Sequence, residues 1–358
     1  MSYFRDNIDA MAGYVPGEQP PPGAKVIKLN TNENPYPPSP AALMVLRELD
    51  GERLRRYPDP SSAAVCRAAA KVYGVPPDWV LAGNGSDELL AMLFRVCACP
   101  GRAVAYPTPT YVLYRTLAAM QDAECIEVPY DEDYNLPAGG LAAASAAMTI
   151  VASPNSPSGT VAPRSVLEEL AGKLPGLLVV DEAYADFSDE NALGLVEKHA
   201  NLVVLRTLSK GYSLAGLRLG FAVSQKPLLD ALAKVKDSYN VDAVACAVGA
   251  AAMEDQAWKI ANAEKVKASR EKLAAGLRRL GFAVWPSQSN FLLARPGDGE
   301  ARRLYEALKQ RGILVRYFQE PRLDDKLRIS VGTEQDNAAL IGELTKLTGP
   351  RPTSARQP

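Results

Sequence analysis

The segment Thr207-Leu-Ser-Lys210-Gly-Tyr-Ser-Leu-Ala-Gly-Leu-Arg218 decides how the rest of the sequence is interpreted. It follows a short apolar run at residues 202–205, so hydroxyls, a lysine and an arginine gather just beyond the carboxyl end of an expected strand. Open α/β sheets bind their ligands at that edge. The two hydroxyls at 207 and 209 can donate to a phosphate, and Arg218 can bind it through two hydrogen bonds. Lys210 can then serve as a neutral, nucleophilic amine, although an ordinary surface loop is the alternative.

A second segment, Leu177-Leu-Val-Val-Asp181-Glu-Ala-Tyr184, puts a carboxylate at the end of another apolar run. A buried carboxylate is costly unless a positive group faces it. A protonated pyridine nitrogen would be such a partner, and the pairing turns the ring into an electron sink. Tyr184 lies close enough along the chain to reach a phenolic oxygen on the same ring. The alternative is that Asp181 only caps a helix after the strand.

Two further turns carry polar groups after apolar runs. In Ser153-Pro-Asn155-Ser-Pro-Ser-Gly159-Thr, two prolines and a glycine hold Asn155 rigidly, as suits an amide that donates to a phenolate oxygen. A simple tight turn is the alternative. In Gly83-Asn-Gly-Ser86-Asp87, backbone amides at a helix start and the Ser86 hydroxyl can cradle a phosphate, or merely cap the helix.

Short apolar runs alternate with helical patterns over most of the chain. Strands are expected at 103–106, 149–152, 177–180 and 202–205, and helices at 61–73, 87–97, 111–120 and 257–280. This alternation predicts an α/β fold with a mostly parallel sheet that helices cover on both faces. Beyond Gly281, expected strands at 282–285, 290–294, 313–316 and 327–331 and a helix at 300–311 indicate a smaller α+β unit.

The composition excludes several classes of function. The 40 basic and 41 acidic residues give a net charge of -1, which offers no bulk attraction to nucleic acid or to an anionic membrane. The single histidine, His199, disfavours Ser-His-Asp catalysis and histidine-rich metal sites. The five cysteines are scattered, and the Cys97/Cys99 pair lacks a second pair, so we expect no metal and a reduced, cytoplasmic protein. We expect neither a signal peptide nor a membrane span.

The four segments, in this order, resemble the fold-type I aminotransferases that use pyridoxal 5′-phosphate (PLP), and more closely the histidinol-phosphate aminotransferases. Further matches are Leu29-Asn-Thr-Asn32-Glu-Asn-Pro-Tyr36, Arg56-Tyr57-Pro-Asp59, Ser289-Asn-Phe291 and Leu327-Arg328-Ile-Ser-Val-Gly-Thr333. The resemblance covers residues 14–347. The chain departs from the family's usual pattern in Ser153-Pro-Asn-Ser-Pro-Ser-Gly, and in Gly211, where alanine is more common.

The resemblance implies a fold and its boundaries. It implies a fold-type I PLP transferase, with a mostly parallel seven-stranded sheet in a large domain flanked by helices and a smaller α+β domain. Residues 1–48 would form an N-terminal arm and part of the small domain. Residues 49–270 would form the large PLP-binding domain and residues 271–350 the small domain, followed by a disordered tail at 351–358.

The resemblance also implies roles for individual residues. Lys210 would hold the cofactor covalently and move protons, and Asp181 would pair with the pyridine nitrogen. Asn155 and Tyr184 would hold the phenolic oxygen, and Tyr111 would stack on the ring. The cofactor phosphate would be held by Ser86, Asp87, Thr207, Ser209 and Arg218, and by Tyr57 from the other subunit of a homodimer. The substrate would be bound by Tyr14, Asn32, Arg316 and Arg328.

The activity that the resemblance implies is transamination between L-histidinol phosphate and 2-oxoglutarate, giving imidazole acetol phosphate and glutamate in histidine biosynthesis. Both half-reactions would use one site, so ping-pong kinetics are expected. An aromatic amino acid aminotransferase and a threonine-phosphate decarboxylase of the same fold are the enzymatic alternatives. A regulator or scaffold that only binds the cofactor is the alternative from another class.

Overall fold

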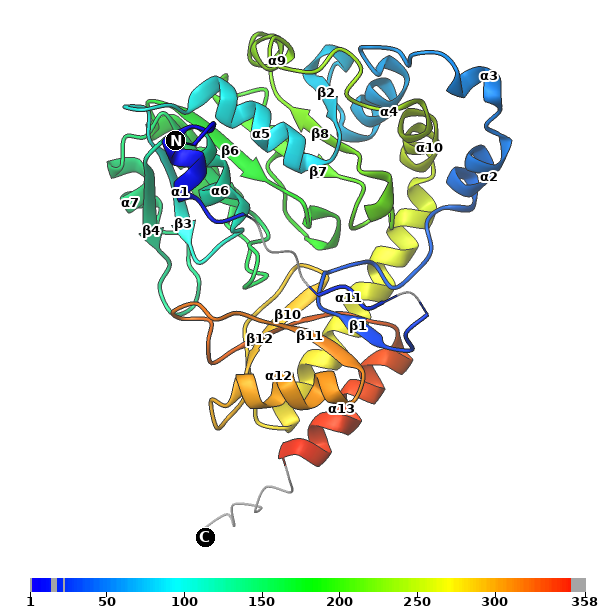
Figure 1. Ribbon diagram of the computed structural model, residues 1–358, viewed down its shortest axis with the longest axis vertical. Helices are drawn as coiled ribbons and strands as arrows, with labels where there is room; N and C mark the ends of the chain where they lie inside the picture. The colour runs from blue at the N-terminus through cyan, green and yellow to red at the C-terminus, as the bar shows by residue number, and fades with distance from the viewer. Residues whose placement is uncertain (1, 14–17, 22, 349–358) are drawn as a thin grey trace.

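Two β-sheets organise the computed structural model, which describes residues 2–13, 18–21 and 23–348 (Figure 1). A seven-stranded sheet lies in the upper part of the view and a five-stranded sheet in the lower part. The long helix α11 (Gln256–Arg279) runs from one part into the other. None of the described helices is both long enough and apolar enough to cross a membrane.

The seven-stranded sheet has the order β2-β8-β7-β6-β5-β3-β4. The pairs from β7 through β6, β5 and β3 to β4 are parallel, whereas β8 is antiparallel to both β2 and β7. The strands are β2 (Val80–Gly83), β3 (Val104–Thr108), β4 (Cys125–Pro129), β5 (Met148–Ala152), β6 (Leu177–Asp181), β7 (Leu202–Thr207) and β8 (Gly220–Val223).

Both faces of this sheet are buried. Val179 and Val203 belong to an apolar cluster with residues of α5 (Ser86–Cys97) and α6 (Leu113–Met120). Their neighbours Val180 and Val204 belong to a separate cluster with residues of α8. Because successive side chains of a strand point to opposite faces, a strand covered on both sides must be apolar almost throughout.

The remaining helices lie around the large sheet. They are α1 (Asp6–Ala10), which lies beside α6, and α2 (Pro40–Glu48), α3 (Gly51–Leu54), α4 (Ala63–Tyr73), α7 (Ala138–Ala143), α8 (Arg164–Lys173), α9 (Lys226–Ala233) and α10 (Ala243–Glu254). Short 3₁₀ turns occur at η1 (Pro77–Trp79), η2 (Ala185–Phe187), η3 (Leu193–Leu195) and η4 (Ala215–Leu217).

The five-stranded sheet joins a strand near the N-terminus, β1, to strands of the C-terminal part of the chain. Its order is β1-β11-β12-β10-β9, with β1 parallel to β11 and the other pairs antiparallel. Leucines of α11, α12 and α13 pack with its strands in one core. The elements are β1 (Ile27–Leu29), β9 (Ala283–Val284), β10 (Phe291–Arg295), β11 (Ile313–Tyr317), β12 (Leu327–Ser330), α12 (Ala301–Gln310) and α13 (Glu334–Thr348).

The fold class predicted from the sequence is confirmed, because a mostly parallel sheet of seven strands accompanies a smaller α+β part. Each expected strand is present with ends shifted by one or two residues. The sequence does not predict the short strands β1 and β2. It also does not predict β4, which is only partly buried, or β8, which begins with a glycine two residues after Arg218. The helix expected from residue 111 begins at Leu113. The predicted tail at 351–358 lies outside the described residues.

Gly220, at the start of β8, lies close to the backbone at the start of α5. A Cβ atom at Gly220 would lie 2.6 Å from Ser86 N, 2.8 Å from Gly85 C and 2.9 Å from Arg206 O. All three are backbone atoms, so a side chain there would push the helix start away from the sheet.

We therefore expect Gly220→Ala to destabilise the fold by about 1–3 kcal/mol, the usual cost of overpacking. Urea unfolding measures this loss. Gly216→Ala is the matched control, because a Cβ atom there meets nothing within 4 Å. Equal unfolding midpoints for both variants would show that the backbone around Ser86 tolerates displacement.

Candidate active site

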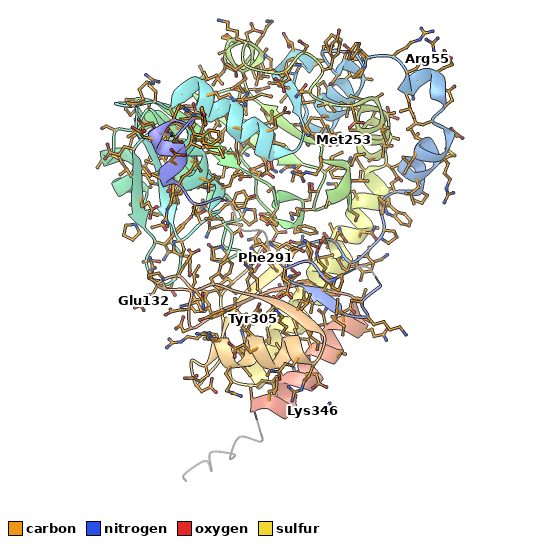
Figure 2. All side chains as sticks on the ribbon, viewed as in Figure 1. Arg55, Glu132, Met253, Phe291, Tyr305 and Lys346 are labelled. Carbon is orange, nitrogen blue, oxygen red and sulfur yellow. The ribbon has the colours of Figure 1, made fainter. Side chains whose placement is uncertain are left out.

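A cavity of about 250 Å³ lies where the carboxyl ends of β5, β6 and β7 face the small sheet. Phe291, at the start of β10, lies centrally between the upper and lower parts of the molecule (Figure 2). The cavity is lined by residues predicted for the site and by others: Asn30, Thr31, Asn32, Ser86, Asp87, Thr110, Tyr111, Ser156, Asp181, Tyr184, Thr207, Ser209, Lys210, Arg218, Arg316, Phe318, Glu320, Leu323 and Arg328.

Lys210 extends into this cavity from the turn after β7. Its Nζ donates to Thr31 O at 3.4 Å and lies 5.6 Å from the centre of the Tyr184 ring. The Asn34 amide donates to Lys210 O at 3.0 Å, which ties the N-terminal segment to the backbone of the lysine loop. The N-terminal segment therefore contacts Lys210, the predicted nucleophile, through both its side chain and its backbone.

Asp181 ends β6 and is only 5% exposed. Its carboxylate accepts hydrogen bonds from Tyr114 Oη at 2.7 Å and from Ala183 N at 3.2 Å. Burial raises the pKa of Asp181 to about 6. It forms no ion pair with any residue that the structure describes, so a cationic ligand group in the cavity would find an uncompensated carboxylate.

A cluster of donors lies beside Asp181. Ser86 opens α5, and Thr207 Oγ1 donates to Ser209 Oγ at 3.0 Å. Arg218 has a left-handed φ of 54° and directs Nη1 to Ser209 Oγ at 3.4 Å. A Cβ atom at Gly85 would lie 2.6 Å from Arg218 Nη2, so a side chain there would displace the guanidinium. A helix N-terminus, two hydroxyls and an arginine suit a phosphate.

Asp87 and Tyr111 lie at the same end of the cavity. Arg218 Nη2 donates to Asp87 Oδ2 at 3.0 Å, and Tyr111 Oη donates to Asp87 Oδ1 at 3.3 Å. The Asp87 carboxylate thus holds the Arg218 guanidinium, and Asp87 also lies in the first turn of α5. Tyr111 lines the cavity, as its predicted place on the cofactor ring requires.

Tyr184 and Asn32 are joined by a hydrogen bond from Asn32 Nδ2 to Tyr184 Oη at 3.0 Å. Asn32 adopts a left-handed φ of 58° and is almost fully buried. Ser330 Oγ accepts from Asn32 N and donates to Asn32 Oδ1, both at 2.9 Å, while Asn290 Nδ2 donates to Asn32 O. The small sheet therefore fixes the residue that orients Tyr184.

Asn155 is a predicted site residue that does not line the cavity. Its Nδ2 donates to Ser158 Oγ at 2.9 Å and to Pro109 O at 3.3 Å, and its Oδ1 accepts from Thr110 Oγ1 at 2.8 Å. The amide is thus engaged within its own loop and the neighbouring one. Its contact with a phenolic oxygen stays a prediction.

Arg316 and Arg328 are direct cross-strand partners on β11 and β12, so both project from the same face of the small sheet. Arg328 donates to Ser156 Oγ at 3.1 Å and to Asn30 O at 2.9 Å. The Phe318 ring lies 5.2 Å from the Arg316 guanidinium and 5.5 Å from that of Arg328. Two guanidinium groups in one cavity form a pocket for an anion.

Tyr57 and Tyr14 are the remaining predicted site residues. Tyr57 is 82% exposed and stacks on Tyr239 with ring centres 4.5 Å apart, away from this cavity. Tyr14 lies outside the described residues. The described part of the chain holds no group of three or more His, Cys, Asp or Glu residues arranged to bind a metal ion.

The residues present fit PLP. Asp181 suits the ring nitrogen, the donor cluster with Arg218 suits the phosphate, and Lys210 is the one lysine that lines the cavity in the described structure. The sequence does not predict the contributions of Tyr114, Asn34 and Phe318. Tyr114 follows Tyr111 at helical spacing, which is the only local signal for it.

Comparison with known proteins identifies the class. The family model of class I and II aminotransferases matches residues 24–344, and the chain belongs to this family. Within it, the chain is similar over almost its whole length to histidinol-phosphate aminotransferases. It is 59% identical to histidinol-phosphate aminotransferase 1 of Trichormus variabilis, over 97% of this chain and 99% of that protein.

Other proteins similar to this chain are also histidinol-phosphate aminotransferases. Histidinol-phosphate aminotransferase of Geobacter sulfurreducens is 45% identical over 96% of this chain and 99% of its own length. Among solved structures, that of histidinol-phosphate aminotransferase from Sinorhizobium meliloti in complex with pyridoxal-5′-phosphate superposes with a TM-score of 0.89. The two are 27% identical, and the alignment covers 97% of this chain and 98% of that one.

A buried ion pair between Arg206 and Glu182 lies next to Asp181 in the structure of the site. Glu182 follows Asp181, and Arg206 Nη1 donates to Glu182 Oε2 at 2.9 Å. Asp186 lies 3.9 Å from Arg206 and 3.4 Å from Lys259 of α11. Burial raises the pKa of Glu182 to about 7, against the opposing charge of Arg206. The ends of β6 and β7 are thereby joined next to the turn that carries Lys210.

Arg206→Met removes the cation and leaves a buried carboxylate, so we expect a loss of about 3–5 kcal/mol at pH 8. In the variant the folded pKa of Glu182 rises further above its unfolded value of 4.5. A raised folded pKa costs stability as pH increases, so the loss should shrink toward pH 5. Urea unfolding at both pH values measures this difference.

Arg302→Met is the control, because it removes an arginine from an exposed pair with Glu306. It should leave the pH dependence of unfolding unchanged. If Arg206→Met follows the wild-type pH profile, the Glu182 carboxylate is not the group that Arg206 compensates.

Proposed function

We propose that this chain transfers the amino group of L-histidinol phosphate to 2-oxoglutarate, giving imidazole acetol phosphate and glutamate, with PLP as cofactor. The reaction belongs to histidine biosynthesis. The observation that carries the proposal is the single cavity in which Lys210, Asp181 and the donor cluster face the Arg316 and Arg328 pair. The similarity to histidinol-phosphate aminotransferases supports the choice of substrate.

The cofactor, when bound, supplies an electron sink for the carbanion that deprotonation of an amino donor produces. Asp181 keeps a negative charge opposite the ring nitrogen, and Tyr184 Oη, oriented by Asn32, serves the phenolic oxygen. Arg218, Ser209, Thr207 and the start of α5 hold the phosphate. Lys210 Nζ would hold the cofactor covalently, and as a free amine it would accept the α-proton of the amino donor and return a proton to complete the transfer.

The two arginines provide for both half-reactions. The amino donor brings a phosphate and the oxo acid brings a distal carboxylate, and a guanidinium forms paired hydrogen bonds with either anion. The Phe291 and Phe318 rings lie 5.4 and 5.5 Å from the Arg328 guanidinium and make the surroundings of this charge apolar. One pocket can therefore alternate between the two anions.

A substrate panel tests the proposal. The PLP-loaded protein is mixed in single turnovers with L-histidinol phosphate, phenylalanine, tyrosine or threonine phosphate, and loss of the visible absorbance of the bound cofactor is followed. We expect a rapid change with histidinol phosphate alone. A comparable response to the aromatic amino acids would make the chain an aromatic aminotransferase, and release of CO₂ from threonine phosphate would make it a decarboxylase.

Lys210→Ala should lower turnover by at least about 10³-fold, because it removes both the covalent link and the proton carrier. The unfolding midpoint should stay near that of the wild type. Lys71→Ala, at an exposed position on α4, is the control and should keep full turnover. Wild-type turnover in Lys210→Ala would overturn the assignment and favour a protein that binds the cofactor without catalysis.

We further propose a cytoplasmic homodimer in which Tyr57 reaches the cofactor phosphate of the other subunit. The exposure of Tyr57, away from the cavity of its own subunit, supports this placement. The absence of disulfides among the five cysteines agrees with a reducing compartment. The domain boundaries at residues 48, 270 and 350 remain part of the same proposal.

Tyr57→Phe should weaken PLP binding about tenfold, the effect of losing one hydrogen bond to a charged group. Tyr239→Phe, on the ring that stacks against Tyr57, is the matched control and should bind PLP normally. Sedimentation at the concentrations used for binding identifies the dimer. A monomer that binds PLP with full affinity would contradict the proposal.

A further inference from the structure

Tyr114 is a buried tyrosine whose hydroxyl contacts the central carboxylate of the site. Its Oη donates to Asp181 Oδ2 at 2.7 Å, and the side chain has no solvent exposure. Tyr114 belongs to α6, whereas Asp181 ends β6, and the two are 67 positions apart in the sequence. It does not line the cavity, so its influence on a ligand passes through Asp181.

The ring of Tyr114 is fixed by its surroundings. The Tyr106 ring lies 5.9 Å away and the Tyr111 ring 5.7 Å away, the latter in an edge-to-face arrangement. Tyr114 also belongs to the apolar cluster that includes Ile150 and Val179 of the sheet. The phenol therefore cannot swing away without opening the core, and its hydroxyl points in one direction.

We propose that Tyr114 is a positioning residue that keeps the Asp181 carboxylate charged and oriented toward the cavity for the ring nitrogen of PLP. The inference rests on the proposed use of PLP, but not on the identity of the amino donor. Removing the hydroxyl while keeping the ring would leave Asp181 with Ala183 N as its remaining described hydrogen-bond donor.

The charged and titratable groups around Asp181 support this role. Burial and the Asp87 carboxylate at the start of α5 raise the pKa of Asp181, whereas Tyr114 and the Ala183 amide lower it. Burial first, and then Asp181, raise the pKa of Tyr114 well above its usual value, so it remains a proton donor. Without Tyr114, the Asp181 carboxyl would be neutral over more of the neutral pH range and would lose its attraction for a pyridinium.

The test compares the affinities of the apoprotein for PLP and for the 1-deaza analogue, in which carbon replaces the ring nitrogen. The ratio of the affinity for PLP to the affinity for the analogue isolates the contribution of Asp181, because the contacts with Lys210 and with the phosphate are common to both ligands. In the wild type the ratio should fall as the pH drops below about 6. In Tyr114→Phe we expect this fall about one pH unit higher and a ratio on the order of tenfold lower at pH 7.

Tyr106→Phe is the matched control. It removes a hydroxyl from another buried ring of the same cluster, but that hydroxyl donates to Glu127 Oε1 at 2.9 Å. Its affinity ratio should equal that of the wild type at every pH. A Tyr114→Phe ratio that also equals the wild-type ratio would overturn the proposal.

A second variant covers the case in which Tyr114→Phe fails to fold. 3-Fluorotyrosine at position 114 keeps the ring and strengthens the hydroxyl as a donor, so the fall of the ratio should move to lower pH. If the affinity ratio falls at the same pH as in the wild type, or at a higher pH, the role of Tyr114 is refuted. Failure of the proposed substrate would remain distinguishable, because it would change the substrate panel and leave the PLP affinity ratio intact.

Discussion

The burial of the Asp181 carboxylate is the constraint on which the site depends. A carboxylate that is 5% exposed at the end of a central strand carries a large desolvation cost. Two hydrogen bonds, from Tyr114 and Ala183 N, offset part of that cost, and the raised pKa of about 6 shows that a part remains. A ligand with a positive ring nitrogen removes the remainder. The parallel sheet makes this possible because β5, β6 and β7 end at the same edge.

The small sheet completes the site through side-chain alternation. Val315 and Leu327 face the helical core of the small sheet, and their neighbours Arg316 and Arg328 face the cavity. Asn32 connects the two sheets, since Ser330 holds it in a left-handed conformation while its amide reaches Tyr184 of the large part. A shift of either sheet relative to the other would therefore move both the cofactor contacts and the substrate contacts.

The sequence predicts the residues that follow strands and fails for those whose roles depend on distant partners. Asp181 comes directly after one apolar run, and Lys210 and Arg218 lie in the polar segment that follows the next one, so a local pattern locates them at the ligand-binding edge. Tyr114 contacts a residue 67 positions away, and Asn34 contacts the lysine loop 176 positions away, which no local pattern contains. For Asn155 the pattern predicts a rigid amide correctly in kind, but the competing acceptors within reach decide where that amide donates.

The pairing of Arg316 with Arg328 places two positive charges side by side in the pocket. Like charges directly opposite each other on neighbouring strands are destabilising, and contacts of both guanidinium groups with the Phe318 ring oppose the repulsion. An entering anion relieves the rest, whatever its chemical type. The attraction is therefore built into the pocket as a property of charge, and the fork of each guanidinium matches two oxygens of a phosphate or of a carboxylate. Discrimination between substrates must then come from the groups nearer to Lys210, where the donor and the oxo acid differ in shape.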